Sequence, residues 1–390
     1  MSDQLQTAVE PAHTRQPTLS ELAYVFLKLG TVAFGGPAAH IAMMADEFVR
    51  KRGWISETDF LDRLAAANLI PGPSSTELAI FIGREKRGWA GLVVAGCCFI
   101  IPAAVLVTLL AAIYVRSGSL PRVAGVFYAI KPAVIAIIVQ ALWGLARTAT
   151  KTRFLAAVGI ISLVLAVVGI APLLVLAIAG VVSGAALWLR RERGKLAMIP
   201  FAGRVALLVG TAAAIVPISL SRLFLSFLKI GSVVFGSGYV LLAFLRTEFI
   251  DHLHWLTEKQ LIDAVAVGQF TPGPVFTTAT FIGYLVGGIR GAVVATVGIF
   301  LPGFLLVAVS GPLIPRIRRS PTAAAVLDGV VAGSLALMAV VAWQLGRAAI
   351  VDWLTAVIFL VSAIALLRFR LNSVWLIAGA ALIGVLIRGN

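Results

Sequence analysis

The chain has 390 residues, of which 60% are hydrophobic and 13% are charged, and its formal net charge is +15. Soluble domains carry about 25% charged residues, so this composition excludes a chain that folds around one water-exposed core. The excess of Lys and Arg does not indicate nucleic-acid binding, because the basic residues lie in short clusters between apolar segments, which is the positive-inside pattern of membrane proteins.

The first 18 residues are polar and contain proline, and they lack the charged region and short apolar core of a secretory signal. We therefore expect an N-terminal tail at 1–18. Cys97 and Cys98, the only cysteines, are adjacent inside an apolar run and match no metal-ligand spacing. We expect neither a metal nor a cofactor.

From residue 19 onward the sequence is an internal repeat, because Phe26-Leu-Lys-Leu-Gly30 recurs as Phe227-Leu-Lys-Ile-Gly231 and further matches follow in the same order. The matched pairs include Phe34-Gly35 and Phe235-Gly236, Glu47 and Glu248, Trp54 and Trp255, Asp62 and Asp263, Pro71-Gly72-Pro73 and Pro272-Gly273-Pro274, Gly83 and Gly283, Gly88 and Gly288, and Gly91 and Gly291. Such order indicates duplication. We predict a first repeat at 19–191 (half one), a linker at 192–219 and a second repeat at 220–390 (half two).

Each half predicts the same elements in chain order. A long apolar segment is interrupted by Phe-Gly, a mixed-charge loop follows, and a second segment is broken by Pro-Gly-Pro. Four continuous apolar segments then follow, at about 89–115, 122–146, 154–169 and 171–189 in half one and at about 289–314, 322–346, 349–367 and 371–387 in half two. A spanning helix needs about 20 apolar residues, so we predict an all-α polytopic membrane protein.

Basic residues in matching loops indicate how each half is oriented. Loop 84–88 holds three basic residues and its partner 284–290 holds one, whereas loop 116–122 holds fewer than its partner. The reversed bias predicts two halves of inverted topology, with the linker's basic run in the cytoplasm and the C-terminus in the periplasm. Because each broken segment can span or re-enter, we expect 10 to 13 membrane segments. We favour thirteen, in which 205–218 crosses and six spans flank it on each side, although the basic loop 45–64 favours re-entry of one broken segment.

The breaks are the candidate binding site. A helix broken at mid-membrane exposes N–H groups with partial positive charge, which favour an anion, and inverted repeats with interrupted helices are common in secondary transporters. The structural alternatives are helix capping, and lysines that extend to the interface. The predicted substrate-binding residues are Gly35, Gly36, Pro71, Gly72, Pro73, Ser74, Ser75, Thr76, Gly236, Ser237, Gly238, Pro272, Gly273, Pro274, Thr277, Thr278, Lys28 and Lys229.

Other ionisable residues in apolar segments are functional candidates. Glu77 is the candidate for proton coupling, and Lys131 and Asp328 are expected to pair across the pseudo-twofold axis. His40 is expected to be a packed polar group. The matched acids Asp62 and Asp263, like Glu47 and Glu248, are expected to organise the interfacial loops.

The combination of these motifs resembles the chromate transporter (CHR) family. Half one carries Phe34-Gly35-Gly36-Pro37 and Pro71-Gly72-Pro73, and half two carries Phe235-Gly236-Ser237-Gly238 and Thr271-Pro272-Gly273-Pro274. The resemblance covers 19–390 and is to the long, two-domain form. It implies export of chromate from the bacterial cytoplasm across the inner membrane, chromate resistance, and binding roles for the motif glycines and prolines.

Two alternatives remain open. A transporter of sulfate or another oxyanion, including one that works in uptake, has the same requirements, because sulfate and chromate share shape and charge. An intramembrane enzyme or lipid-binding scaffold requires clustered catalytic side chains, which the sequence lacks, and no nucleotide-binding loop is present. The expected partners are the oxyanion and the lipid bilayer, and a homodimer is compatible with the sequence.

Overall fold

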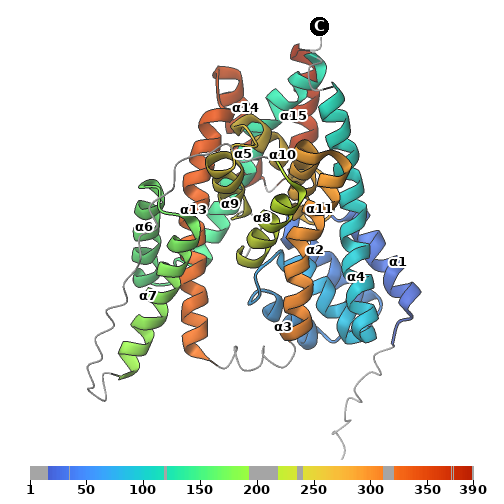
Figure 1. The fold of residues 1–390 in the computed structure, drawn as a ribbon, viewed down its shortest axis with the longest axis vertical. Coiled ribbons are helices and arrows are strands. Elements are labelled where there is room, and N and C mark those ends of the chain that lie inside the picture. The colour runs from blue at the N-terminus through green and yellow to red at the C-terminus, as the bar shows by residue number, and fades with distance from the viewer. Residues whose placement is uncertain are drawn as a thin grey trace, which may run out of the picture.

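The structure is a computed structural model that describes residues 16–34, 36–117, 121–192, 218–234, 240–310, 320–369, 371 and 373–388. Across these ranges the regular secondary structure is entirely helical (Figure 1). The prediction of an all-α fold is therefore confirmed.

Half one begins with four short elements and continues with longer helices. Its elements are α1 (Leu19–Val32), α2 (Gly36–Ala45), the π-helix η1 (Asp46–Lys51), α3 (Glu57–Ala67), α4 (Ser74–Ser117), α5 (Pro121–Ala149), α6 (Arg153–Val167) and α7 (Pro172–Glu192).

Half two repeats this order. Its elements are α8 (Leu220–Val233), α9 (Leu241–Arg246), the π-helix η2 (Thr247–His252), α10 (Glu258–Phe270), the short 3₁₀ turn η3 (Val275–Thr277), α11 (Thr278–Ser310), α13 (Pro321–Ala349), α14 (Trp353–Arg368) and α15 (Ser373–Arg388).

Matched residues begin matched helices. The side chains of Thr18 and Ser219 cap α1 and α8, and those of Ser56 and Thr257 cap α3 and α10. In each case the hydroxyl oxygen accepts a hydrogen bond from a backbone N–H of the first turn, which has no partner within the helix. The duplication has therefore kept the signals that set where the helices start.

α4 and α11 each contain a sharp turn. Gly88 and Gly288 have φ of 57° and 61°, a backbone conformation that residues with a side chain rarely adopt. At each turn the chain folds back, so that Gly83 lies against the carbonyl of Gly91, as Gly283 does against that of Gly291. Glycine at these positions lets the two arms touch backbone to backbone. The loop predicted at 84–88 is shorter than predicted, because only Arg87 and Gly88 leave helical geometry.

The two halves run in opposite directions. In Figure 1 the long arm of α4 ends at the top of the molecule, where α5 begins, whereas α11 ends at the bottom, where α13 begins. The last two helices of each half pack on the long helix of the other half: α6 and α7 lie against α13, and α14 and α15 lie against α5. The predicted inversion is confirmed, and the halves are interleaved rather than side by side.

The two helices that flank the first break are each too short to cross a bilayer. α1 has 14 residues and α2 has 10, and a 14-residue helix is about 21 Å long, against about 30 Å for the hydrocarbon core. Neither piece crosses the bilayer alone, so whether the broken segments of half one span as two joined pieces or re-enter stays a prediction.

Five helices are long and apolar enough to cross a membrane: Ser74–Ser117, Ala124–Ala146, Pro172–Leu189, Val275–Ser310 and Pro321–Ala349. Shorter apolar helices lie at Arg153–Val167, Trp353–Arg368 and Ser373–Ile387. The linker segment 205–217, on which a thirteenth crossing depends, lies outside the described residues, so the choice within the range of 10 to 13 stays a prediction.

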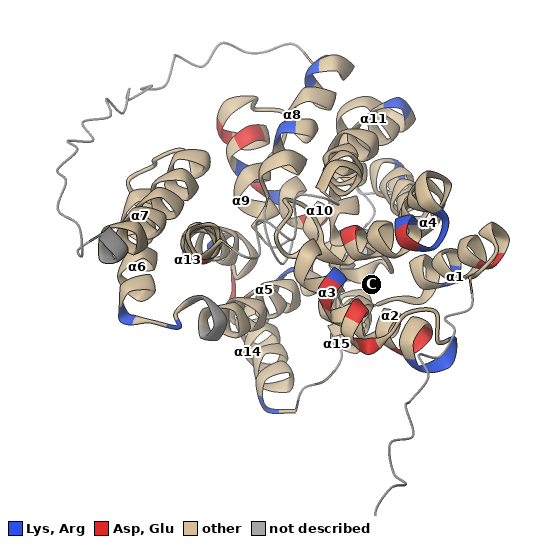
Figure 2. Cartoon of the chain, turned by 90° about the horizontal axis from the view of Figure 1, so that it is seen from below, with Lys and Arg blue, Asp and Glu red and all other residues tan. Residues whose placement is uncertain are grey.

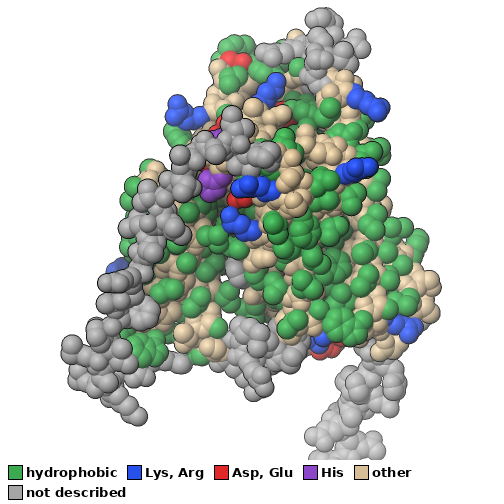
Figure 3. Space-filling view, viewed as in Figure 1, with side chains coloured by type: hydrophobic (Ala, Val, Ile, Leu, Met, Phe, Trp, Pro, Cys, Tyr) green, Lys and Arg blue, Asp and Glu red, His purple; other side chains and the backbone are tan. Residues whose placement is uncertain are grey.

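The outer surface is apolar along the long helices. Val105, Leu109 and Ile113 on α4 are each more than half exposed and follow one another at helical spacing. Figure 3 shows hydrophobic side chains over much of one face, and Figure 2 shows most helices free of charge along their length. This distribution fits lipid around the helices.

The contacts at the two turns predict that Gly83→Ala or Gly283→Ala lowers the free energy of unfolding by about 1–3 kcal/mol, because the new methyl group meets a backbone carbonyl that has no room to move. Gly144→Ala is the matched control, because a methyl group on Gly144 in α5 meets nothing within 4 Å. Thermal unfolding in detergent compares the stability of the three variants. Equal behaviour of the three variants would contradict close packing of the arms.

Candidate anion site at the helix breaks

The breaks of the two halves are joined to each other by backbone hydrogen bonds. The N–H of Gly72 donates to the carbonyl of Val234 at 2.6 Å, and the N–H of Gly273 donates to the carbonyl of Ala33 at 2.9 Å. Gly72 and Gly273 occupy matched positions in the repeat, as do Ala33 and Val234. Each Pro-Gly-Pro therefore bonds the end of the other half's first helix, in a reciprocal pair.

Glycine is required at positions 72 and 273 because the backbone there has a positive φ. Gly72 and Gly273 have φ of 132° and 88°, and a side chain on Gly273 would meet Ala103 and the carbonyl of Gly30. The flanking prolines have no N–H and cannot continue a helix. The motif thus supplies one backbone donor at the point where the halves meet.

His40 supports the same contact. Its Nε2 lies 3.0 Å from the carbonyl oxygen of Ala33, and its Nδ1 lies 3.2 Å from the hydroxyl oxygen of Ser75. Because a carbonyl only accepts, Nε2 carries a proton, and in the neutral ring Nδ1 accepts the Ser75 proton. His40 is 1% exposed and packs edge-on against Phe99, which agrees with the expected packed polar group. Half two has Leu241 at this position.

The predicted hydroxyl donors of half two bond their own backbone. Thr277 donates to the carbonyl of Pro274 and Thr278 to that of Val275, both at 2.8 Å. In half one the buried hydroxyl of Thr76 has no partner among the described residues. Ser74 is also buried, at the first turn of α4.

The first break is described only in part. Gly36, with φ of 77°, begins α2, and Pro37 follows it in the first turn. The predicted site residues Gly35, Gly236, Ser237 and Gly238 lie outside the described residues.

Glu77 lies fully buried beside the break of half one. It is 0% exposed, and neither carboxyl oxygen has a hydrogen-bond partner among the described residues. A side chain on Gly72 would meet this carboxyl group, and one on Gly303 would come within 3.7 Å of Oε1. A buried carboxyl without a partner is costly to stability, so this position is a functional candidate. Its counterpart in half two is Thr278.

The two predicted lysines lie beside the π-helices. Lys229 pairs with Glu248 at 3.0 Å and is about half exposed. Lys28 lines a cavity of about 510 Å³ with Glu47, Lys51, Arg52 and Trp54.

The sequence did not reveal a buried cluster that links the halves. Asp263 on α10 is 0% exposed; Lys131 Nζ lies 3.0 Å from Oδ1, and the Tyr114 hydroxyl donates to Oδ2 at 2.8 Å. The expected pairing of Lys131 with Asp328 is wrong, because Asp328 faces Lys151 at 3.6 Å.

The expectation that Asp62 and Asp263 organise matching interfacial loops is wrong for Asp263, since α10 carries this carboxylate into the interior. Asp62 is exposed. Two acids at matched positions in the sequence therefore have different surroundings.

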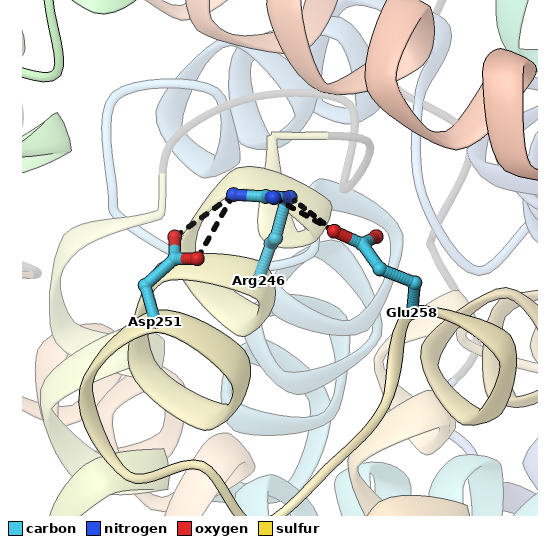
Figure 4. Close-up of polar contacts among 3 residues, drawn as sticks. All are labelled: Arg246, Asp251 and Glu258. Carbon is cyan, nitrogen blue, oxygen red and sulfur yellow. Dashed lines mark hydrogen bonds and ion pairs between the residues drawn. The ribbon is translucent and has the colours of Figure 1, made fainter.

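A second polar cluster lies in half two between α9 and α10. Arg246 contacts both carboxylate oxygens of Asp251, at 2.9 and 3.1 Å, and Glu258 at 2.7 Å (Figure 4). Burial raises the pKa of the Asp251 carboxyl, and Arg246 opposes this shift. Arg246 and Asp251 line a cavity of about 600 Å³ between η2, α13 and the turn joining α6 to α7.

Among the residues that the structure describes, no group of three His, Cys, Asp or Glu side chains is arranged to hold a metal ion. The polar groups at the breaks are backbone N–H groups, hydroxyls, one imidazole and one carboxyl. This arrangement suits a ligand held by hydrogen bonds.

Comparison with known proteins gives a consistent result. The sequence model of the family described as "Chromate transporter" matches residues 20–185 and 221–385, one match in each half. The chromate transport protein of Cupriavidus metallidurans is 35% identical over 388 residues, covering 97% of this chain and 96% of the relative.

Two further relatives carry related names. The probable chromate transport protein of Synechococcus elongatus is 31% identical over 85% of this chain and 84% of its own length, and the chromate transport protein of Pseudomonas aeruginosa is 32% identical over 80% of this chain and 77% of its own. No solved structure matches the chain.

The position of His40 predicts that His40→Leu, which installs the residue of half two, lowers the free energy of unfolding by about 1–3 kcal/mol, because the buried hydroxyl of Ser75 loses its acceptor. The control is His252→Leu, since His252 is more than half exposed and surface changes stay within about 0.5 kcal/mol. Denaturant unfolding in detergent compares them. A His40 variant as stable as the control would contradict the proposed support of the break.

Proposed function

From the premise that the chain belongs to the chromate transporter family, we propose that it is a secondary transporter that exports chromate from the cytoplasm across the inner membrane and thereby confers chromate resistance. The chain is a multi-pass membrane protein and, as its relatives' names indicate, a transport protein rather than an enzyme. Direction, driving force and the resistance phenotype are the parts that we add.

One observation carries the proposal: the reciprocal bonds between Gly72 and Val234 and between Gly273 and Ala33. They join two inverted halves at four helix breaks. Around them lie the first turns of α2, α4 and α11, whose N–H groups carry partial positive charge. An oxyanion between the breaks would be held by hydrogen bonds, and rocking of one half against the other would expose it to each side in turn.

The membrane potential is sufficient to drive this direction. Moving one charge across 100 mV is worth about 2.3 kcal/mol, so an inside-negative potential favours the outward step of a dianion by about twice that amount. Proton coupling is therefore optional. If it occurs, Glu77 is the group that we assign to it, because its buried carboxyl has no fixed partner among the described residues.

Sulfate or another oxyanion is the alternative cargo, and uptake is the alternative direction. We also expect that a homodimer is compatible with function but not required, since one chain contains both halves. Competition between chromate and sulfate distinguishes the cargoes.

We expect chromate uptake into inverted membrane vesicles that contain the protein, and we expect sulfate to inhibit it. Gly273→Ala should lower this uptake about tenfold or more, because a residue with φ of 88° is strained and its methyl group meets Ala103 at the break. Gly169→Ala is the matched control: its φ is 91°, but a methyl group there meets nothing within 4 Å.

The outcomes separate the claims. Absence of uptake above empty vesicles, with the folded protein present, would contradict chromate as cargo. Equal losses in the two glycine variants would mean that backbone strain alone is responsible, and the role of the break would be contradicted.

Glu77→Gln tests proton coupling. At zero membrane potential, an imposed proton gradient should alter chromate flux through the wild type and not through the variant, because the amide cannot exchange a proton. Flux driven by potential should persist in both. A wild type that ignores the proton gradient would remove Glu77 from this role.

A further inference from the structure

The two halves provide an internal comparison at their π-helices. In half two, Lys229 on α8 pairs with Glu248 on η2, and Glu248 also accepts a hydrogen bond from Ser226. The matched residues in half one are Lys28 and Glu47. If the halves were alike, Lys28 would pair with Glu47.

Half one departs from this arrangement because of Arg52. The Nε of Arg52 lies 2.8 Å from Glu47 Oε1, and its guanidinium lies over the ring of Trp54, 5.1 Å from the centroid. Half two has Leu253 at the position of Arg52 and cannot form this contact. Arg52 therefore takes the carboxylate that Lys28 would use, and Lys28 has no ion pair among the described residues.

The neighbouring cation is also engaged. Lys51 Nζ lies 2.6 Å from Asp46 and 4.0 Å from the second oxygen of Glu47. This hydrogen bond lowers the pKa of the Asp46 carboxyl. The cavity of about 510 Å³ is thus lined by three cations and one carboxylate, with Trp54 as its aromatic wall.

The sign of the charge differs between the two halves at matched positions. Arg50, Lys51 and Arg52 of half one correspond to Asp251, His252 and Leu253 of half two. In half two Arg246 is held by two carboxylates (Figure 4). The cavity of half one therefore contains more cations than carboxylates, whereas Arg246 of half two is outnumbered by its two carboxylate partners.

We propose that the cavity lined by Lys28, Lys51, Arg52 and Trp54 is a binding site for a tetrahedral oxyanion dianion on the side of half one, before the breaks. Lys28 supplies the free ammonium, and Arg52 and Lys51 supply further donors at the cavity wall. The proposal rests on the proposed function for the identity of the anion. The site would bind the anion at one entrance of the transporter before the anion reaches the breaks. A phosphate of a lipid headgroup has the same chemistry, and we commit to the free anion.

Sulfate binding to the purified protein, measured by calorimetry in phospholipid-free detergent, tests the site. We expect Lys28→Gln and Arg52→Leu each to weaken sulfate binding about tenfold. Arg52→Leu installs the half-two residue and leaves Glu47 available to Lys28, so it should neutralise the site without removing the lysine. Unfolding temperatures establish that both variants are folded.

Arg50→Gln is the matched control, because Arg50 carries the same charge in the π-helix that Arg52 directly follows, and it does not line the cavity. We expect less than a twofold change in sulfate binding. If Arg50→Gln weakens binding as much as Arg52→Leu, the effect is general surface charge and the site is overturned. Unchanged binding in Lys28→Gln would also overturn it.

A second arm distinguishes the source of the anion. In nanodiscs of phosphatidylcholine, adding phosphatidylglycerol should not reduce sulfate binding. Loss of binding on this addition would identify a headgroup site and overturn the proposal. Wild-type vesicles that lack chromate uptake while Lys28-dependent sulfate binding persists would contradict the proposed function and leave the site standing.

Discussion

The structure depends on backbone groups that have no partner within their own half. At the depth of the breaks, helices end, and each free N–H or carbonyl must be satisfied without water. The hydrogen bonds from Gly72 to Val234 and from Gly273 to Ala33 satisfy such groups reciprocally, since each half supplies one donor and one acceptor to the other. The same interlocking of the halves recurs at the terminal helices, because α6 and α7 pack on α13 whereas α14 and α15 pack on α5.

Much of this arrangement was predictable because the duplication makes local signals visible twice. Gly88 and Gly288 mark turns that only glycine readily adopts, and the matched caps Thr18 and Ser219 begin matched helices. The family and the all-α fold followed from such signals. The packing of α6 and α7 on α13, and of α14 and α15 on α5, became clear only from the structure.

The sequence failed where a side chain had several candidate partners. Lys131 is near the matching position of Asp328 in the repeat, yet it pairs with Asp263, which belongs to a different helix of half two. Arg52 similarly takes Glu47 from Lys28. Pairing of this kind is decided by how helices pack in three dimensions, and a repeat with equal residues at two positions does not imply equal surroundings.

The reciprocal bonding has a consequence for biogenesis. While the ribosome has made only half one, the N–H of Gly72 and the carbonyl of Ala33 lack the partners that Gly273 and Val234 later provide. These two backbone groups therefore reach their final hydrogen bonds only after the second half has been inserted. Completion of the breaks is then a late step of assembly that requires both halves of the chain.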